Sequence, residues 1–92
     1  MFVRASFVVR TINDAVVVPV SAILERGRQR TVFIIDDVQA REVVIETGLE
    51  TNGLTEVISG VSEGDRIVTE GQEQLRTGMR VRILEDVNNV NN

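Results

Sequence analysis

The sequence has 92 residues, 14 acidic and ten basic side chains, a net charge of −4, and neither cysteine nor histidine. This length predicts a single domain, and the missing residue types exclude a disulfide framework, a thiolate metal site and histidine acid–base chemistry. All ten basic residues are arginine, which excludes Schiff-base chemistry by lysine, and the acidic balance argues against nucleic acid as a partner. Only 3% of the residues are aromatic, so we expect a core of β-branched aliphatic side chains in β-strands.

The first part of the chain alternates in polarity and then becomes continuously apolar. Residues 1–10 predict a half-buried strand, because apolar side chains recur at every second position. The inward-facing residues are Val3, Ala5, Phe7 and Val9. Residues 15–20 predict a strand buried on both faces, with Pro19 at its end because proline cannot donate to the ladder.

A short helical turn and a polar loop are expected next. Residues 21–25 have the composition of a single helical turn, and Ser21 is a suitable N-cap. Residues 25–30 are polar and centred on Gly27, which predicts a hairpin loop.

The middle of the chain predicts a hairpin. Residues 31–35 and 40–47 are strand-like segments joined by an acidic turn at Asp36-Asp37. Val43 and Ile45 are expected to share one face of the second strand, opposite Glu42, Val44 and Glu46, and Gly48 is expected to end this strand.

Residues 57–71 contain the clearest turn signals in the sequence, and we expect the rest of the chain to be organised around them. Asn52-Gly53 is a two-residue turn signal that leads into this stretch, because both residues tolerate positive φ. Gly60 is expected to end the first of its two strands, Gly64-Asp65 to form the turn, and Gly71 to break the second strand. The stretch predicts a hairpin or a corner in a small β-domain.

The last part of the chain predicts a helical turn and a final strand. Residues 72–77 form the turn with Leu75 as its apolar anchor and Gly78 as its C-cap. Residues 79–83 alternate like a strand, and residues 85–92 are an Asn-rich tail that we expect to be disordered. The predicted fold class is all-β: a small β-barrel or β-roll of six to seven short strands with one or two single-turn helices.

Few side chains suggest a functional site. The candidate docking residues for a protein partner are Arg26, Arg28 and Arg30, since arginine is favoured at interfaces. Asp36-Asp37 could touch a cation, and Glu63 with Asp65 could form an acid–base pair, but turn chemistry explains both. We therefore expect no catalytic, cofactor-binding or metal-binding residue. No apolar run reaches the length of a transmembrane helix and no signal peptide is visible, so we expect either a cytoplasmic chain or a piece of a longer one.

Several motifs occur in the order found in one known family. Val18-Pro19 with Ala22 matches a Val-Pro-x-x-Ala motif, and residues 57–71 match Val-x-x-Gly-Leu-x-x-Gly-(Asp/Glu)-x-Val-Val-x-x-Gly, with Val61 in place of Leu. Further motifs of the same family match this sequence at residues 1–4, 31–35, 43–48 and 75–78. Together they resemble the C-terminal part of periplasmic adaptor subunits, the HlyD-type membrane fusion proteins of RND efflux and related systems. The structural signature positions are Pro19, Gly48, Gly60, Gly64, Asp65, Gly71 and Gly78.

The resemblance implies a division of the chain and a function. Residues 1–12 would be the last strand of the adaptor β-barrel domain, 13–84 the membrane-proximal β-roll domain, and 85–92 the tail. The module would dock a periplasmic adaptor onto an inner-membrane transporter of RND or ABC type. Its other partners would be further adaptor protomers and, through domains outside this sequence, an outer-membrane channel. It would lie in the periplasm, attached to the inner membrane through other parts of the full-length protein, and would be neither an enzyme nor dependent on a cofactor.

Two further expectations remain. In the family, the membrane-proximal domain takes an extra strand from near the N-terminus of the protein, so an unpaired sheet edge and self-association of this chain are expected. The alternative function is a free-standing small β-barrel that binds a ligand. The lack of Trp and Tyr weakens that alternative, since sugar sites commonly use an aromatic platform.

Overall fold

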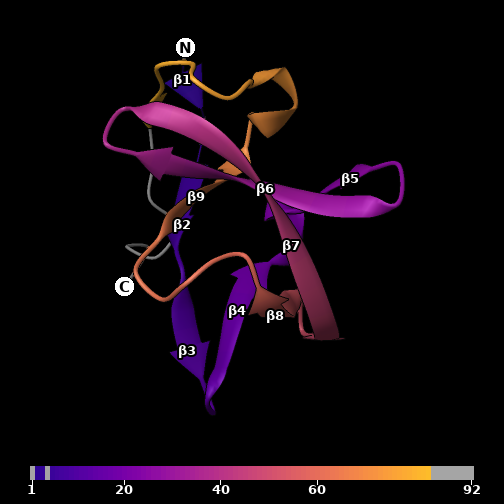
Figure 1. Cartoon of the computed structure of the whole chain (residues 1–92). Coiled ribbons are helices and arrows are strands. Elements are labelled where there is room, and N and C mark those ends of the chain that lie inside the picture. Colours follow the sequence, from indigo (N-terminus) through magenta and orange to yellow (C-terminus); the bar gives the residue numbers. More distant parts are fainter. Residues whose placement is uncertain (1, 4, 84–92) are drawn as a thin grey trace.

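The computed structural model describes residues 2–3 and 5–83, which form short strands and two 3-10 turns (Figure 1). The strands are β1 (Phe2–Val3), β2 (Ala5–Val8), β3 (Arg10–Ile12), β4 (Ala15–Pro19), β5 (Leu24–Arg26), β6 (Gln29–Asp36), β7 (Gln39–Thr51), β8 (Leu54–Ser59), β9 (Arg66–Glu70) and β10 (Arg82–Ile83). The 3-10 turns are η1 (Val20–Ala22) and η2 (Gln72–Gln74). The all-β prediction is confirmed, although the described strands are more numerous and several are shorter than expected.

The strands form one curled antiparallel sheet and a small parallel pair. The order in the large sheet is β2-β9-β6-β7-β8-β4-β3, and β5 pairs with the start of β6. Strands β1 and β10 pair in parallel beside it. The long strand β7 connects the two halves, because its first part pairs with β6 and its second part with β8. Figure 1 shows β7 crossing from the β6 side to the β8 side.

Strand β7 contains Gly48 instead of ending there, so that expectation was wrong. The pairing of β7 with β8 shifts register between Glu46 and Thr47 and again before Glu50, which bends the strand. A Cβ atom on Gly48 would lie 2.6 Å from Oε1 of Glu56 on β8. Gly48 thus lies where a neighbouring side chain approaches closely, not in a turn, and a Cβ atom there could be accommodated by a movement of the flexible Glu56 side chain.

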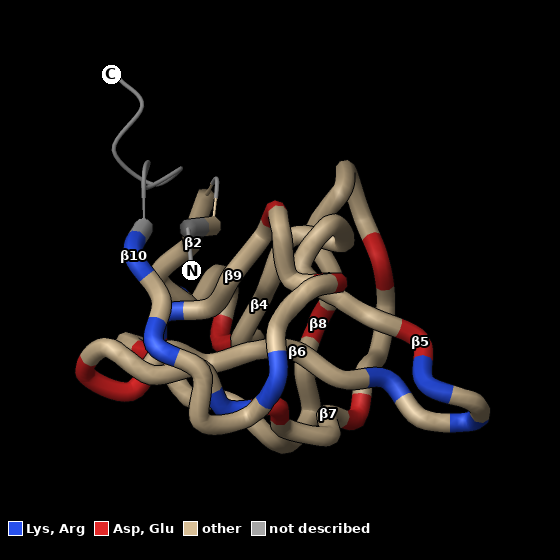
Figure 2. The backbone as a smooth tube through the Cα atoms, turned by 90° about the horizontal axis from the view of Figure 1, so that it is seen from above, with Lys and Arg blue, Asp and Glu red and all other residues tan. Residues whose placement is uncertain are grey.

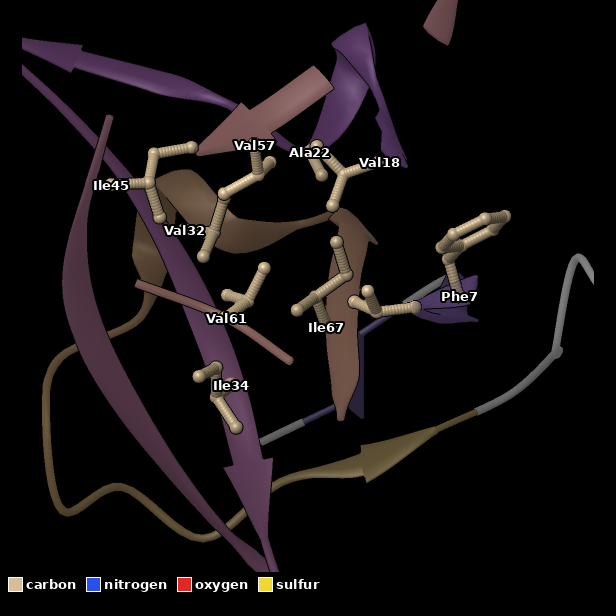
Figure 3. Packing of buried hydrophobic residues seen from close by; sticks show 10 residues of the cluster. Phe7, Val18, Ala22, Val32, Ile34, Ile45, Val57, Val61 and Ile67 are labelled. Atoms are coloured by element: carbon tan, nitrogen blue, oxygen red, sulfur yellow. The ribbon is translucent and has the colours of Figure 1, made fainter. Parts of the chain in front are cut away.

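The main core lies inside the curl of the sheet (Figure 3). Its side chains come from β2, β4, η1, β6, β7, β8 and β9 and from the connections that contain Val9 and Val61, and they face a common interior. The buried members are Phe7, Val9, Val18, Ala22, Val32, Ile34, Ile45, Val57, Val61 and Ile67. The aliphatic core expected from the composition is confirmed.

A second core cluster lies on the other face of β6 and β9. Phe33 and Val68 point into it, whereas their neighbours Val32 and Ile67 point into the main core. The C-terminal segment covers this second cluster with Leu75 and other side chains. Strands β6 and β9 are thus buried on both faces, which explains their uninterrupted apolar runs.

Residues 57–71 form a corner, one of the two arrangements expected. Strand β8 pairs with β4 and β7, whereas β9 pairs with β2 and β6. Gly60, Gly64 and Gly71 all have positive φ, at 114°, 96° and 95°. The Asp65 carboxylate accepts a hydrogen bond of 2.8 Å from the Ser62 backbone N–H, which closes the connection.

Both predicted helical turns are present, but their ends differ from expectation. η1 follows Pro19, and no side chain caps it, so Ser21 is not its N-cap. η2 ends at Gln74 with Leu75 as its C-cap, so Gly78 does not cap it. Gly78 instead has φ 95° and donates its N–H to the Ala40 carbonyl, which holds the last segment against β7.

The N-terminal segment that was predicted as one strand packs within the same unit as the rest of the described chain. Strand β2 pairs with β9, and Phe7 contributes to the main core. The assignment of residues 1–12 to a neighbouring barrel domain remains a prediction about a longer protein. The ends of the strand order are β2 and β3, and the expected tail at 85–92 lies outside the described residues.

Candidate docking surface

The three candidate arginines lie on a hairpin that projects from the body of the molecule. Strands β5 and β6 are joined by a two-residue turn at Gly27 and Arg28, with Gly27 at φ 63°. Figure 2 shows basic residues at the end of this hairpin, and Figure 1 shows it extending away from the curled sheet. The hairpin expected from the sequence is present, with a shorter turn than the predicted loop.

The hairpin does not present the arginines as one patch. Arg26 is paired across the ribbon with Gln29, and Glu25 with Arg30. Because side chains alternate along a strand, Arg26 and Arg30 lie on opposite faces of the ribbon. Arg28 occupies the turn between them, and no hydrogen bond or ion pair joins it to another described residue.

Arg26 belongs to a polar cluster on one face of the hairpin. Its Nε lies 2.9 Å from Oε2 of Glu42 on β7, and the buried Thr31 hydroxyl donates to the same oxygen at 2.7 Å. These contacts lower the pKa of Glu42 below its ordinary value of 4.5, with the Thr31 hydrogen bond as the largest cause and Arg26 as a further one. The cluster ties the base of the hairpin to β7.

Arg30 is held on the opposite face. Its guanidinium donates to the Thr47 hydroxyl at 2.8 Å and lies 3.8 Å from the Glu25 carboxylate. Both flanking arginines are therefore held in place by intramolecular contacts, and Arg28 at the tip is the member available to a partner.

A groove lies at a different corner of the molecule, and the sequence analysis did not find it. It has a volume of about 580 Å³ and runs between the β3–β4 hairpin and the β7–β8 hairpin. Its lining is Ile12, Asn13, Ala15, Val17, Leu49, Thr51, Asn52, Leu54 and Glu56. Leu49 is 79% exposed and Ile12 is 38% exposed, so both keep apolar surface in solvent.

Two of the four acidic candidates, Asp36 and Asp65, have structural partners. The Asp36 carboxylate accepts a 2.6 Å hydrogen bond from Arg41, which raises the pKa of that guanidinium, and Asp65 closes the corner described above. Within residues 2–3 and 5–83, no group of three or more acidic side chains is arranged to hold a metal ion. No helix in the same part of the chain is long and apolar enough to cross a bilayer.

Removing the Thr31 hydroxyl is expected to destabilise the hairpin base. Thr31→Val should raise the pKa of Glu42 and lower the free energy of unfolding by about 1–2 kcal/mol at neutral pH. A carboxyl with a lowered folded-state pKa stabilises the fold above its unfolded-state pKa, and this contribution is lost as pH falls through the folded-state pKa. The difference between wild type and variant should therefore shrink in acid.

This expectation is checked by NMR titration of Glu42 and by urea unfolding at neutral and acidic pH. Thr11→Val on the exposed strand β3 is the matched control and should change neither quantity appreciably. An unchanged Glu42 pKa in Thr31→Val would contradict the assigned hydrogen bond.

The curled antiparallel sheet with its single-turn helices places the chain among small β-barrel-like domains. Residues 15–83 match the family described as the YknX C-terminal permuted SH3-like domain, and the chain belongs to that family. This match confirms the resemblance to the C-terminal region of periplasmic adaptor subunits.

Relatives named multidrug resistance protein MdtA are similar to nearly all of the chain. The protein of Cronobacter turicensis is 31% identical over 85 residues, which cover 91% of this chain and 20% of that protein. The protein of Salmonella typhi is 34% identical over 87 residues, which cover 91% of this chain and 21% of that protein. The protein of Pantoea ananatis is 33% identical over 86 residues, which cover 90% of this chain and 20% of that protein. The chain thus spans about a fifth of the length of the curated relatives it matches.

Proposed function

We propose that this chain is the membrane-proximal module of a periplasmic adaptor in a multidrug efflux system, and that it docks the adaptor onto its inner-membrane transporter. The observation that carries the proposal is the alignment of 90–91% of the chain with relatives named multidrug resistance protein MdtA. The transporter is of RND or ABC type. Other adaptor protomers are further partners, and an outer-membrane channel is reached through domains of the longer protein. The module lies in the periplasm, attached to the inner membrane through those other parts.

The geometry supports a structural role in assembly. The chain is a flat unit of 37 × 33 × 19 Å with an arginine-bearing hairpin at one corner and a partly apolar groove at another. Arg26 and Arg30 contact Glu42 and Thr47 on β7, and these contacts connect the hairpin to the body of the sheet. Contacts formed before binding reduce the entropy that is lost when a partner binds. We assign no catalytic step to the module.

A chimera tests this proposal. Residues 1–83 of this chain would replace the matching segment of Salmonella typhi MdtA, in cells that lack their own MdtA. We expect the chimera to restore growth in the presence of drug and to co-purify with an inner-membrane transporter from detergent extracts. A chimera that reaches normal abundance but restores no resistance and retains no transporter would overturn the proposal.

Variants of the same chimera test the docking residues. Replacing Arg26, Arg28 and Arg30 by Gln should reduce drug resistance at unchanged abundance. Arg28→Gln alone should also reduce resistance, and Arg82→Gln, which removes one exposed arginine from β10, is its control for the loss of a single charge. Equal drug resistance in Arg28→Gln and Arg82→Gln would show that the hairpin is not part of the docking surface.

A further inference from the structure

The groove contains a carboxylate that has no cationic partner among the described residues. Glu56 lines the groove, is only partly exposed, and forms no hydrogen bond or ion pair with another described residue. Its Oε1 lies directly over Gly48, in space that any other residue would fill with a Cβ atom. A carboxylate beside apolar surface gains more from a cation than a fully solvated one does, because water screens it less.

Apolar side chains line the same groove as this carboxylate. They include Leu49 from β7, Ile12 from β3, and Leu54 and Val17, and they share the lining with the polar residues Asn13, Thr51 and Asn52. The groove therefore suits a side chain with an apolar stem and a cationic end. Arginine has this chemistry: its methylene groups pack on apolar surface while its planar guanidinium binds a carboxylate.

The chain carries such a side chain at a distant corner. Arg28 occupies the turn of the β5–β6 hairpin and is exposed. Figure 1 shows this hairpin extending to the right of the body, whereas the β3–β4 and β7–β8 hairpins lie at its lower end. The tip and the groove therefore occupy different corners of one copy, so a contact between them is best made by two copies.

We propose that the hairpin tip of one copy docks into the groove of the next, with Arg28 on Glu56 and the arginine stem on Leu49 and Ile12. Charge complementarity selects this occupant, since the tip is basic and the groove holds an unpaired acid. The interface is head-to-tail, so each added copy leaves one free tip and one free groove. The inference depends on the surface chemistry of this chain alone and does not rest on the proposed function.

A charge exchange tests the contact in the complete 92-residue chain. The wild type should associate as its concentration rises, pass beyond a dimer in sedimentation velocity, and dissociate when salt is added. Arg28→Glu and Glu56→Arg should each weaken association by about tenfold or more, because each places like charges in contact. An equimolar mixture of the two variants should associate again, because each tip then meets a groove of opposite charge.

Two controls make the result decisive. Circular dichroism and thermal unfolding verify that each charge variant is folded, and Leu49→Ser tests the groove through a side chain that is mostly in solvent. Leu49→Ser should also weaken association. The proposal is overturned if the wild type stays monomeric or stops at a symmetric dimer, as edge-to-edge pairing of β3 would give. It is also overturned if the mixture associates no better than the single variants.

Discussion

Gly60→Ala is expected to lower the free energy of unfolding by about 3–5 kcal/mol, because strain and a steric clash add together. Gly60 has φ 114°, a backbone conformation that residues with a Cβ rarely adopt. A Cβ atom there would lie 2.7 Å from the Val44 carbonyl oxygen and 3.0 Å from the Ile45 Cα. These are backbone atoms of β7, so relief requires moving the strand that joins the two halves of the sheet.

Gly64→Ala is the matched control in the same corner. Gly64 also has positive φ, at 96°, but a Cβ atom would meet nothing within 4 Å. This variant should lose only about 1–2 kcal/mol, from backbone strain alone. Urea unfolding of both variants measures the difference between them. Equal losses would mean that the clash with β7 contributes nothing and that the corner relaxes freely.

Features governed by local backbone chemistry could be predicted from the sequence. Asn52-Gly53 forms the expected turn with both residues at positive φ, and β8 ends at Ser59, directly before Gly60, as expected. The alternation of residues 40–47 placed Ile45 in the core. Such features follow from the conformational range of a few neighbouring residues and from the period of the hydrophobic pattern, which are both readable along the chain.

Features governed by contacts between distant segments could not be predicted in this way. Gly48 resembles a strand terminator in sequence, but it lies inside β7 because the residues on both sides of it pair with β8. The sequence predicted a docking role for three arginines of one loop, yet strand pairing divides Arg26 and Arg30 between two faces. The groove depends on two hairpins meeting, so its residues have no shared signal in the sequence.

Phe33→Ala is expected to lower the free energy of unfolding by about 3–5 kcal/mol. Phe33 is the largest fully buried side chain of the described residues and is 0% exposed. It fills the second core cluster between β6 and the C-terminal segment that carries Leu75. The other buried side chains described in this cluster are aliphatic and smaller than a phenyl ring, so they cannot fill the vacated space. The resulting cavity should persist, and cavities that persist give the largest losses.

The second cluster is also the attachment surface of the C-terminal segment, so the loss should not be uniform along the chain. Amide hydrogen exchange in Phe33→Ala should increase first at Gly78 and Val81, whose N–H groups donate to the Ala40 and Val38 carbonyls. Phe33→Leu keeps part of the volume and should lose about 1–1.5 kcal/mol. Ile58→Thr, at a β8 side chain that is 61% exposed, should change stability little. If Phe33→Ala loosened both clusters equally, the two cores would unfold as one cooperative unit, and the C-terminal segment would have no separate opening reaction.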